Sequence, residues 1–492
     1  MAGSGSGAGG ADEGDGALWR SPLSSRYTSR EMQQLFSDRS RARQWREIWI
    51  ALARTQRELG LDLPEREIDA LERRIDEIDL ARAAALEKEL RHDVMAHLHA
   101  FAELHPPAKP FLHLGATSCT VTDNADLVLM KRGLGLLRDA LLQVIEQLAA
   151  FAARTRAIAT LGYTHFQPAQ PTTVGKRACL WLQDLLLDLA ELDRLIDELP
   201  ARGLKGTTGT QASFLTLFRG DAAKVKELDA RFCARLGFAR RFAVTGQTYP
   251  RKLDFRILAV LSGLAQSCAK TGNDLRLLAH EQEVEEPFED KQIGSSAMAY
   301  KRNPMRAERM VSLARYLMHL PVNAAETAGQ QWLERTLDDS ANRRIVLAEA
   351  FLAADALLRI HHSIFKGILV HEPRIRAHLE RELPYMLTEE VLMRAVQAGG
   401  DRQELHERIR VHARAAVERQ KAGAGDNDLF ARLAADPAFA TVRDDLPRLL
   451  QGAGLTGRAV AQVDEFLAEE VRPALAKARS GGVRRGLEDL KV

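Results

Sequence analysis

The amino-acid sequence predicts an all-α protein organised around long helices, and three observations support this prediction. The chain has 492 residues, of which 46% are hydrophobic, so it can bury a large core. From Glu31 onward, apolar residues recur three and four positions apart, the spacing that places them on one face of a helix. One such pattern, residues 253–278, continues for about seven turns, which is long for a globular helix and typical of a helical bundle.

The first segment, residues 1–17, consists almost entirely of Gly, Ala, Ser and acidic residues. Such a composition buries too little apolar surface to offset the entropy lost on ordering, so we expect a disordered tail. Gly5, Gly7 and Gly10 match the G-x-G-x-x-G spacing of a dinucleotide-binding loop, but no strand precedes them and no amphipathic helix follows. The match therefore predicts no dinucleotide site.

Two more long helices are indicated in the middle of the chain. Residues 180–199 are apolar over a broad arc, which predicts a buried helix. Residues 134–151 carry a narrower apolar stripe. The members of this stripe are Leu137, Leu141, Ile145 and Leu148.

Prolines mark the expected helix boundaries, because proline lacks an amide donor and disfavours helix at the residue before it. These prolines are Pro64, Pro106, Pro107, Pro168, Pro171, Pro304 and Pro373. We expect domain limits near residues 117 and 370. The sequence then divides into an N-terminal helical domain (18–117), a central helical-bundle domain (118–370) and a C-terminal helical domain (371–492).

Charge and cysteine content exclude several classes of function. Lys plus Arg number 69 and Asp plus Glu 67, so the net charge of +2 gives no reason to expect a nucleic acid as partner. Cys119, Cys179, Cys233 and Cys268 lie far apart, which argues against a disulfide framework and a thiolate zinc site. No secretory signal is present and no apolar run reaches the ~20 residues of a membrane span. We therefore expect a cytoplasmic protein that binds no membrane.

Several histidines could carry chemistry. His92, His97 and His99 fall on one predicted helix, residues 85–101, but His97 and His99 are two positions apart and would point in different directions. This spacing argues against a metal site. His92 lies within the Arg-His-Asp triplet 91–93, which by itself is a weak signal because such triplets are common on solvated helix faces.

His165 lies in a polar segment in which Pro168 and Pro171 restrict the backbone. A histidine titrates near neutral pH and suits proton transfer, so an oriented catalytic imidazole is one interpretation. A buried structural histidine is the other, and this segment does not separate the two.

Within the polar segment 291–304, residues 294–304 are the most unusual, with a glycine hinge, two serine hydroxyls and two cations. Its backbone amides could cradle an anion, and Lys301 would lower the cost of forming an alkoxide at Ser295 or Ser296. The alternative is a plain connector to a helix that starts near Pro304. Other polar segments of this kind are residues 113–118 and 205–213.

Arginines beside polar turns form a further candidate group. Most surface arginines are solvated and contribute little, but a cluster could bind a small substrate that carries phosphate and carboxylates. The candidates are Arg306, Arg309, Arg335, Arg343 and Arg344, with Ser340 among them.

Taken together, these segments resemble the adenylosuccinate lyase family, a branch of the fumarase, aspartase and argininosuccinate lyase superfamily. Residues 294–304 (GSSAMAYKRNP) are similar to the superfamily's catalytic loop, G-S-S-x-M-P-x-K-x-N-P. The resemblance runs from about residue 25 to the end of the chain. Other matching segments are SRY (25–27), RHD (91–93), LGATS (114–118), THFQPAQ (164–170), KGTTGTQAS (205–213), TGQTY (245–249) and TLDDSANRR (336–344).

The resemblance implies three mostly helical domains with a fumarase/aspartase-like fold. It implies a homotetramer whose central bundles form a twenty-helix core, with each active site built from three subunits. It further implies β-elimination of fumarate from adenylosuccinate, giving AMP, and from SAICAR, giving AICAR, without a metal or organic cofactor. The nearest alternatives are another fumarate-releasing lyase, such as argininosuccinate lyase, and a catalytically silent structural homologue.

The same resemblance implies roles for individual residues. Ser295 would be the general base, assisted by Lys301, and His165 the general acid, oriented by Glu308, while His92 would take part in catalysis and in substrate positioning. The expected substrate-binding residues are Arg26, Tyr27, Arg91, His92, Asp93, Thr117, Ser118, Thr164, Gln247, Asn303, Arg309, Arg335, Ser340 and Arg344. Ala299 stands where the superfamily loop has proline, which should make the open loop more disordered.

Overall fold

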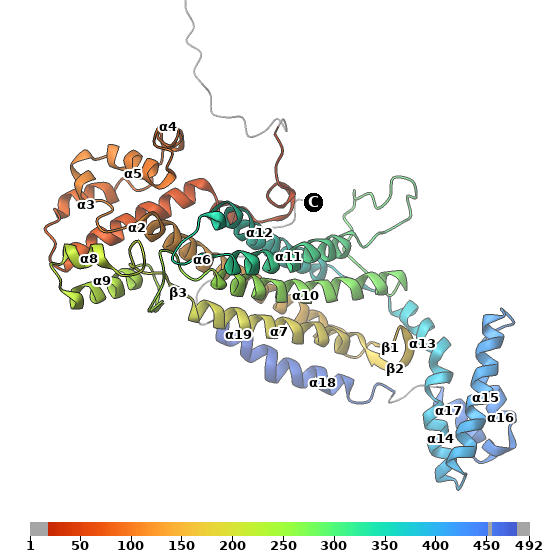
Figure 1. Ribbon diagram of the computed structural model, residues 1–492. Helices are drawn as coiled ribbons and strands as arrows, with labels where there is room; N and C mark the ends of the chain where they lie inside the picture. Colours follow the sequence, from red (N-terminus) through yellow and green to blue (C-terminus); the bar gives the residue numbers. More distant parts are fainter. Residues whose placement is uncertain (1–17, 451–454, 480–492) are drawn as a thin grey trace, which may run out of the picture.

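The computed structural model describes residues 18–450 and 455–479, so the predicted tail with its glycines lies outside it. Figure 1 shows an elongated helical bundle with a group of shorter helices at each end. Within the described residues, the strands form three two-stranded sheets. The prediction of a helical protein is thus confirmed, with small sheets added to it.

Five long helices build the bundle: α6 (Ser118–Arg154), α7 (Val174–Glu198), α10 (Lys252–His280), α11 (Met305–Gly329) and α12 (Asp338–Lys366). The helix α10 packs against α11, α11 against α12, and α6 against α7. The predicted long helices coincide with α6, α7 and α10, and the apolar stripe of α6 is fully buried. The local apolar periodicity therefore identified the core-facing sides correctly.

The N-terminal end consists of a π-helical turn η1 (Leu23–Tyr27), α1 (Arg30–Leu35), α2 (Asp38–Glu58), α3 (Glu65–Glu72), α4 (Leu80–Leu90), α5 (Asp93–Glu103) and a 3₁₀ turn η2 (Pro106–Phe111). The single helix predicted over 85–101 is wrong, because the chain breaks between α4 and α5. Arg91 takes a left-handed conformation with φ of 54°, which ends α4. His92 is extended and caps α5, its Nδ1 accepting from the Met95 amide at 3.4 Å.

Shorter elements connect the long helices. They are β1 (Ala159–Thr164), β2 (Gln167–Thr173), β3 (Pro200–Ala201), α8 (Ala212–Leu217), α9 (Ala222–Arg235), β4 (Arg240–Arg241), β5 (Val284–Glu285) and β6 (Leu369–Val370). Strands β1 and β2 form an antiparallel hairpin, β3 pairs with β4 in parallel, and β5 pairs with β6 antiparallel. Pro168 and Pro171 lie inside β2 and mark no helix boundary, because a two-stranded sheet leaves each strand an edge where a missing amide donor is tolerated.

The C-terminal part forms α13 (Glu372–Met386), α14 (Thr388–Gln397), α15 (Arg402–Lys421), α16 (Leu429–Ala435), η3 (Pro437–Asp445) and α17 (Leu446–Leu449), followed by α18 (Ala459–Phe466), η4 (Leu467–Val471) and α19 (Arg472–Arg479). Residues 383–446 have a hydrophobic core of their own. Val463, Leu467 and Val471 instead join the core of the central bundle, and Figure 1 shows α18 and α19 lying along α7. The domain limits near residues 117 and 370 remain a prediction.

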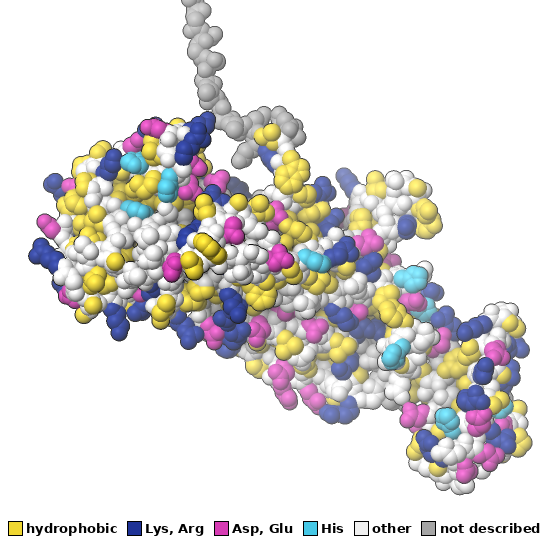
Figure 2. All heavy atoms as spheres, viewed as in Figure 1, with side chains coloured by type: hydrophobic (Ala, Val, Ile, Leu, Met, Phe, Trp, Pro, Cys, Tyr) yellow, Lys and Arg dark blue, Asp and Glu magenta, His cyan; other side chains and the backbone are white. Residues whose placement is uncertain are grey.

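The surface carries both signs of charge. Figure 2 shows Lys and Arg side chains interspersed with Asp and Glu over the visible face, in keeping with the small net charge. Among the described helices, none combines the length and apolar character that crossing a membrane requires.

Candidate active site

The predicted site residues fall into two groups at opposite ends of α10. Gln247 precedes the helix and Ser295 follows it. A helix of 29 residues is about 43 Å long at 1.5 Å per residue. Figure 1 shows the loop after α10 far from the N-terminal helices α2 to α5. One chain therefore does not bring all of the predicted residues together.

The first group joins the triplet 91–93 to the starts of α6 and α12. His92 Nε2 lies 3.2 Å from Ser118 Oγ. The Arg344 guanidinium donates a hydrogen bond to the Asp93 carboxylate. Burial by itself would raise the pKa of Asp93, but hydrogen bonds from Arg344 and the Val94 amide hold this pKa below its usual value. Asp93 is thus a fixed negative charge that orients Arg344.

Backbone hydrogen bonds fix the position of Gln247, and its side chain lies near α6. Its amide donates to the Glu334 carbonyl at 3.0 Å, and its carbonyl accepts from Arg202 Nε at 2.9 Å. Cys119 Sγ lies 3.6 Å from Gln247 Oε1. Arg202 is fully buried and donates also to the carbonyls of Gly203 and Gly206. Arg202 lies in none of the motifs described above, so the sequence did not predict its role in holding this segment.

Close backbone packing fixes the segment 205–213 against the segment 245–249. Gly209 has a φ of 88°, and a Cβ atom added to it would lie 1.9 Å from the Thr245 carbonyl oxygen. Any larger residue would force the two segments apart. Thr117 stands at the start of α6, where its amide donates to Thr120 Oγ1 at 3.1 Å.

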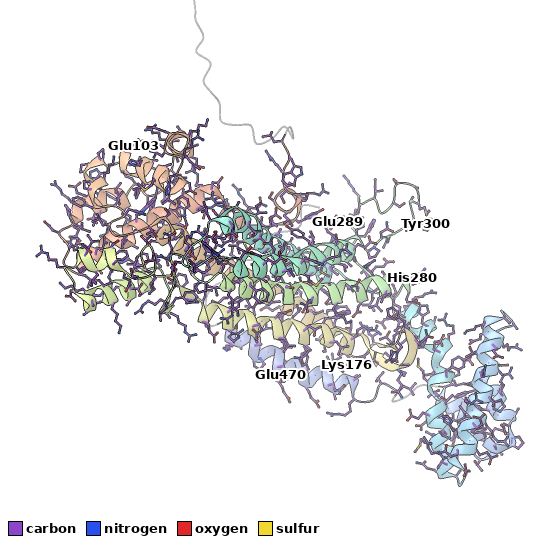
Figure 3. The ribbon with its side chains drawn as sticks, in the orientation of Figure 1. Glu103, Lys176, His280, Glu289, Tyr300 and Glu470 are labelled. Carbon is purple, nitrogen blue, oxygen red and sulfur yellow. The ribbon has the colours of Figure 1, made fainter. Side chains whose placement is uncertain are left out.

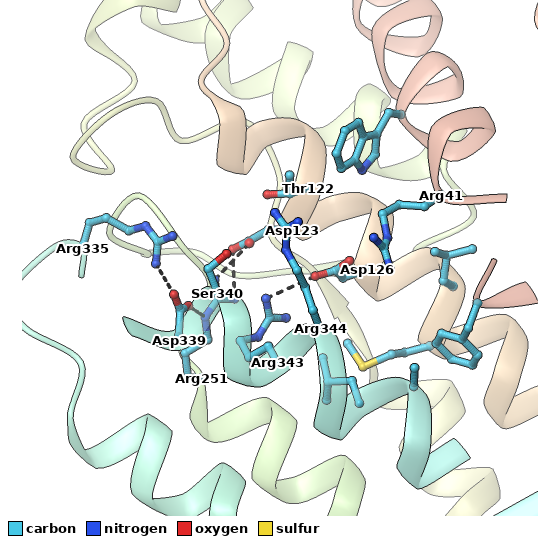
Figure 4. Close-up of a pocket in the computed structure, with 16 residues that line it drawn as sticks. Arg41, Thr122, Asp123, Asp126, Arg251, Arg335, Asp339, Ser340, Arg343 and Arg344 are labelled. Atoms are coloured by element: carbon cyan, nitrogen blue, oxygen red, sulfur yellow. Dashed lines mark hydrogen bonds and ion pairs between the residues drawn. The ribbon is translucent and has the colours of Figure 1, made fainter. Parts of the chain in front are cut away.

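The start of α12 presents Ser340 and Arg344, with Arg335 in the preceding loop, around a cavity of about 90 Å³ (Figure 4). Arg335 Nη1 donates to Asp339 Oδ1 at 2.6 Å. The interpretation of Arg343 as an anion ligand needs correction. This arginine is buried, and its guanidinium pairs with Asp254 at 2.7 Å and Asp126 at 3.2 Å.

The second group is centred on the loop that follows α10. Figure 3 shows Glu289 and Tyr300 on this loop, which projects past His280 at the end of α10. Ser295 Oγ accepts hydrogen bonds from the amides of Met298 at 3.1 Å and Ala297 at 3.4 Å. No described residue contacts the Ser296 hydroxyl in this way. Two loop amides thus point at the Ser295 hydroxyl oxygen, and backbone donors placed in this way favour negative charge on the atom they contact.

The base of this loop is tied to α11, which begins at Met305 as the connector interpretation expected. Glu286 accepts hydrogen bonds from the amides of Arg306 at 2.9 Å and Ala307 at 2.6 Å. Burial raises the pKa of Glu286, although these amides oppose the shift. Asn303 Nδ2 donates to the Gly294 carbonyl at 2.8 Å, which closes the loop on itself. The exposed Lys301 lines a cavity of about 460 Å³ beneath the loop.

Arg309, in the first turns of α11, lies over the ring of Tyr27, with 5.3 Å from its guanidinium carbon to the ring centroid. Arg26 approaches the same ring at 5.9 Å. These three predicted residues therefore do meet in space. Glu308 is exposed on the neighbouring position of α11.

His165 and Phe166 form the two-residue turn of the β1–β2 hairpin. Their φ angles are 53° and 57°, and Thr164 pairs with Gln167 directly below them. Two consecutive left-handed residues give the turn that matches the twist of a hairpin. His165 is exposed, so the interpretation as a buried structural histidine is wrong. Within the described residues of one chain, His165 has no ion pair with Glu308.

Comparisons with known proteins agree with this architecture. A family model described as "Lyase" matches residues 24–318, and one described as "Adenylosuccinate lyase C-terminus" matches residues 384–466. The adenylosuccinate lyases of Schistosoma mansoni and Saccharomyces cerevisiae are each 49% identical to this chain over 93% of its length, covering 96% and 95% of those proteins. A solved structure of 3-carboxy-cis,cis-muconate lactonizing enzyme from Pseudomonas putida superposes with a TM-score of 0.81 at 24% identity, covering 92% of this chain and 99% of that one. This structural likeness concerns the fold only.

Proposed function

The chain belongs to the adenylosuccinate lyase family and is a carbon–nitrogen lyase of purine nucleotide biosynthesis, and we propose that Ser295 and His165 carry its proton transfers. The reaction releases fumarate from adenylosuccinate, giving AMP, and from SAICAR, giving AICAR. The assignment of Ser295 is supported by the two backbone amides that donate to its Oγ, at 3.1 and 3.4 Å.

Ser295 acts as the general base. The C–H bond next to the carboxylate is very weakly acidic, so an alkoxide is the appropriate base and needs stabilisation by fixed donors. The amides of Ala297 and Met298 supply such donors, and the Lys301 ammonium supplies positive charge on the same loop. Asn303 holds the loop in shape through Gly294.

His165 acts as the general acid that protonates the departing nitrogen. Its exposure at the tip of a hairpin allows it to reach a substrate bound by another chain. Glu308 orients this imidazole and raises its proton affinity. Since the two side chains do not pair within the part of one chain that the structure describes, we place the pair between chains.

Binding of the nucleotide uses the remaining predicted residues. Arg335, Ser340 and Arg344 surround the cavity at the start of α12 and suit phosphate or carboxylate oxygens. His92 and Gln247 lie at the same end of the bundle and contact the rest of the substrate. The other binding residues are Arg26, Tyr27, Arg91, Asp93, Thr117, Ser118, Thr164 and Arg309.

A homotetramer with sites shared by three chains would complete this arrangement. The two groups of site residues lie at opposite ends of the 29-residue helix α10 in one chain, and the bundle exposes large apolar side chains. Leu187 on α7, Val322 on α11 and Ile345 on α12 are 60%, 59% and 63% exposed. Burying such a surface at ~25 cal/mol per Å² favours association. We place the protein in the cytoplasm, in keeping with its four free, buried cysteines.

A fumarate-release assay tests the function. The purified protein is given adenylosuccinate, argininosuccinate and aspartate in turn, and fumarate is followed by its ultraviolet absorbance. We expect release from adenylosuccinate only. Release of fumarate from argininosuccinate would show that the protein has the activity of another branch of the superfamily. No release from any of the three substrates would identify a catalytically silent homologue.

A further inference from the structure

Arg335 is the outer end of a buried chain of alternating charges (Figure 4). Asp123 receives both Nη atoms of Arg251 at 3.1 Å. The Nε of Arg251 donates to Asp339 Oδ2 at 2.6 Å, and the other oxygen of Asp339 accepts from Arg335 at 2.6 Å. Asp339 is wholly buried, whereas 22% of the Arg335 side chain is exposed. The chain thus leads from the protein interior to one accessible guanidinium.

The buried carboxylate of Asp339 is charged, and its two hydrogen bonds fix its position. Burial favours the neutral form, but Arg251 and Arg335 outweigh this effect and hold the pKa of Asp339 below its usual value. Because each carboxylate oxygen serves a different arginine, neither guanidinium can move without leaving a buried charge incompletely paired. Arg251 is in turn fixed by two bonds to Asp123.

This attachment leaves the binding edge of Arg335 available. The guanidinium group of Arg335 donates its hydrogen bonds to the protein through Nη1, which contacts Asp339 and the Thr336 carbonyl. No described residue accepts a hydrogen bond from Nε or Nη2. Those two groups form the fork that binds two oxygens of a phosphate or carboxylate at once. A long side chain is normally disordered at a surface, so holding it in place beforehand removes an entropy loss from ligand binding.

We propose that Asp339, supported by Arg251, is a positioning residue that presents the Nε–Nη2 edge of Arg335 to an anionic group of the nucleotide substrate. This inference rests on the proposed function and extends it to residues that do not touch the substrate. Phosphate is the favoured anion, because the Ser340 hydroxyl lines the same cavity as Arg335 and adds a donor.

The test compares Asp339→Asn with Asp338→Asn, a matched control on the adjacent residue. Asp338 is exposed and accepts from Gln331 Nε2 at 3.3 Å. An asparagine at 339 can serve only one of the two arginines. In calorimetric titrations with AMP, we expect Asp339→Asn to weaken binding by about tenfold and Asp338→Asn to leave it unchanged. In turnover assays, the KM of Asp339→Asn should rise more than its kcat falls.

A double-mutant cycle separates positioning from general stability. In an Arg335→Ala background, Asp339→Asn should cause no further loss of AMP affinity, while its effect on the unfolding midpoint should persist. An equal further loss of affinity in that background would overturn the proposal. Titration with fumarate provides a second arm, because a loss confined to fumarate would assign the fork to a substrate carboxylate instead of the phosphate and so overturn the phosphate assignment.

Asp339→Glu covers the case in which the asparagine variant does not fold. It keeps the charge but lengthens the side chain, so it should displace Arg335 and weaken AMP binding in the same way. Unchanged AMP affinity in Asp339→Glu would overturn the positioning role. A wild-type chain that binds neither AMP nor fumarate would contradict the proposed function itself, and the role of Asp339 with it.

Discussion

Glu286 and Ala307, which are 21 positions apart in the sequence, close the base of the loop that carries Ser295, since Glu286 Oε1 accepts the Ala307 amide hydrogen at 2.6 Å. The second oxygen accepts from the Arg306 amide at 2.9 Å. The first amides of a helix have no partner within the helix, so this carboxylate satisfies two of them at the start of α11. It thereby fixes both ends of the loop.

We predict that Glu286→Gln loosens this loop. A glutamine offers a single acceptor oxygen and no charge at the helix N-terminus, which costs about 1 kcal/mol locally. Trypsin should cleave the variant faster within residues 291–302, and kcat should fall several-fold. Glu289→Gln is the control, because the exposed Glu289 carboxylate accepts from the Arg306 side chain, at 3.1 Å, and from no amide of α11 among the described residues. Equal cleavage of the two variants would disprove the role of Glu286.

We predict that Ser295→Ala lowers kcat by ~10³-fold or more while substrate still binds, as expected on loss of a proton-transfer group. Ser296→Ala is the matched control, since its hydroxyl lacks the two amide contacts of Ser295, and it should retain most activity. If the Ser296 variant is the inactive one, the base has been assigned to the wrong serine.

We predict that His165→Asn lowers turnover by ~10²-fold or more. Asparagine tolerates the left-handed conformation that the hairpin requires, so this variant removes the imidazole and keeps the turn. His406→Asn, at an exposed position of α15, serves as the control. Full activity of His165→Asn across neutral pH would rule out His165 as the general acid.

Shared sites predict complementation between inactive variants. Tetramers of His165→Ala and of Ser295→Ala should each be inactive, but mixing them under conditions of subunit exchange should restore activity, because some hybrid sites receive both wild-type segments. The measurement is fumarate release from the mixture, with exchange verified by mass spectrometry. Verified exchange without recovered turnover, or an active monomer in sedimentation, would contradict the shared-site arrangement.

We predict that the buried side chain of His361 makes the stability of the folded chain depend on pH. It is fully buried against Phe365, and among the described residues neither ring nitrogen has a hydrogen-bond partner. Burial lowers its pKa from 6.5 to about 3. The folded chain therefore stays neutral here while the unfolded chain takes up a proton below pH 6.5, so stability falls as the pH falls from about 6.5 toward about 3.

The measurement is the free energy of unfolding by urea at several pH values. His361→Phe should remove about 1.6 kcal/mol of the loss between pH 6.5 and pH 5, because the slope rises from half of ~1.36 kcal/mol per pH unit at pH 6.5 to nearly the full value at pH 5. His406→Phe, at the exposed position, should leave the pH dependence unchanged. An unaltered slope in His361→Phe would show that this histidine does not contribute to it.

The sequence by itself determined the long helices and the chemistry-bearing segments. Apolar spacing is a local property, so residues such as Leu141 and Leu148 revealed the buried side of α6 without knowledge of the fold. The loop around Ser295 was equally visible, because its hydroxyls, cations and glycine lie within eleven consecutive residues.

The tertiary structure decided what depends on contacts between distant segments. Arg251 meets Asp123 across 128 positions and Asp339 across 88, and no periodic pattern marks such pairs. The break at Arg91 and the left-handed turn at His165 likewise depend on backbone angles that these residue types adopt only under packing and pairing constraints. Buried charges must find partners wherever the fold supplies them. The role of Asp339 therefore became visible only once the chain was folded.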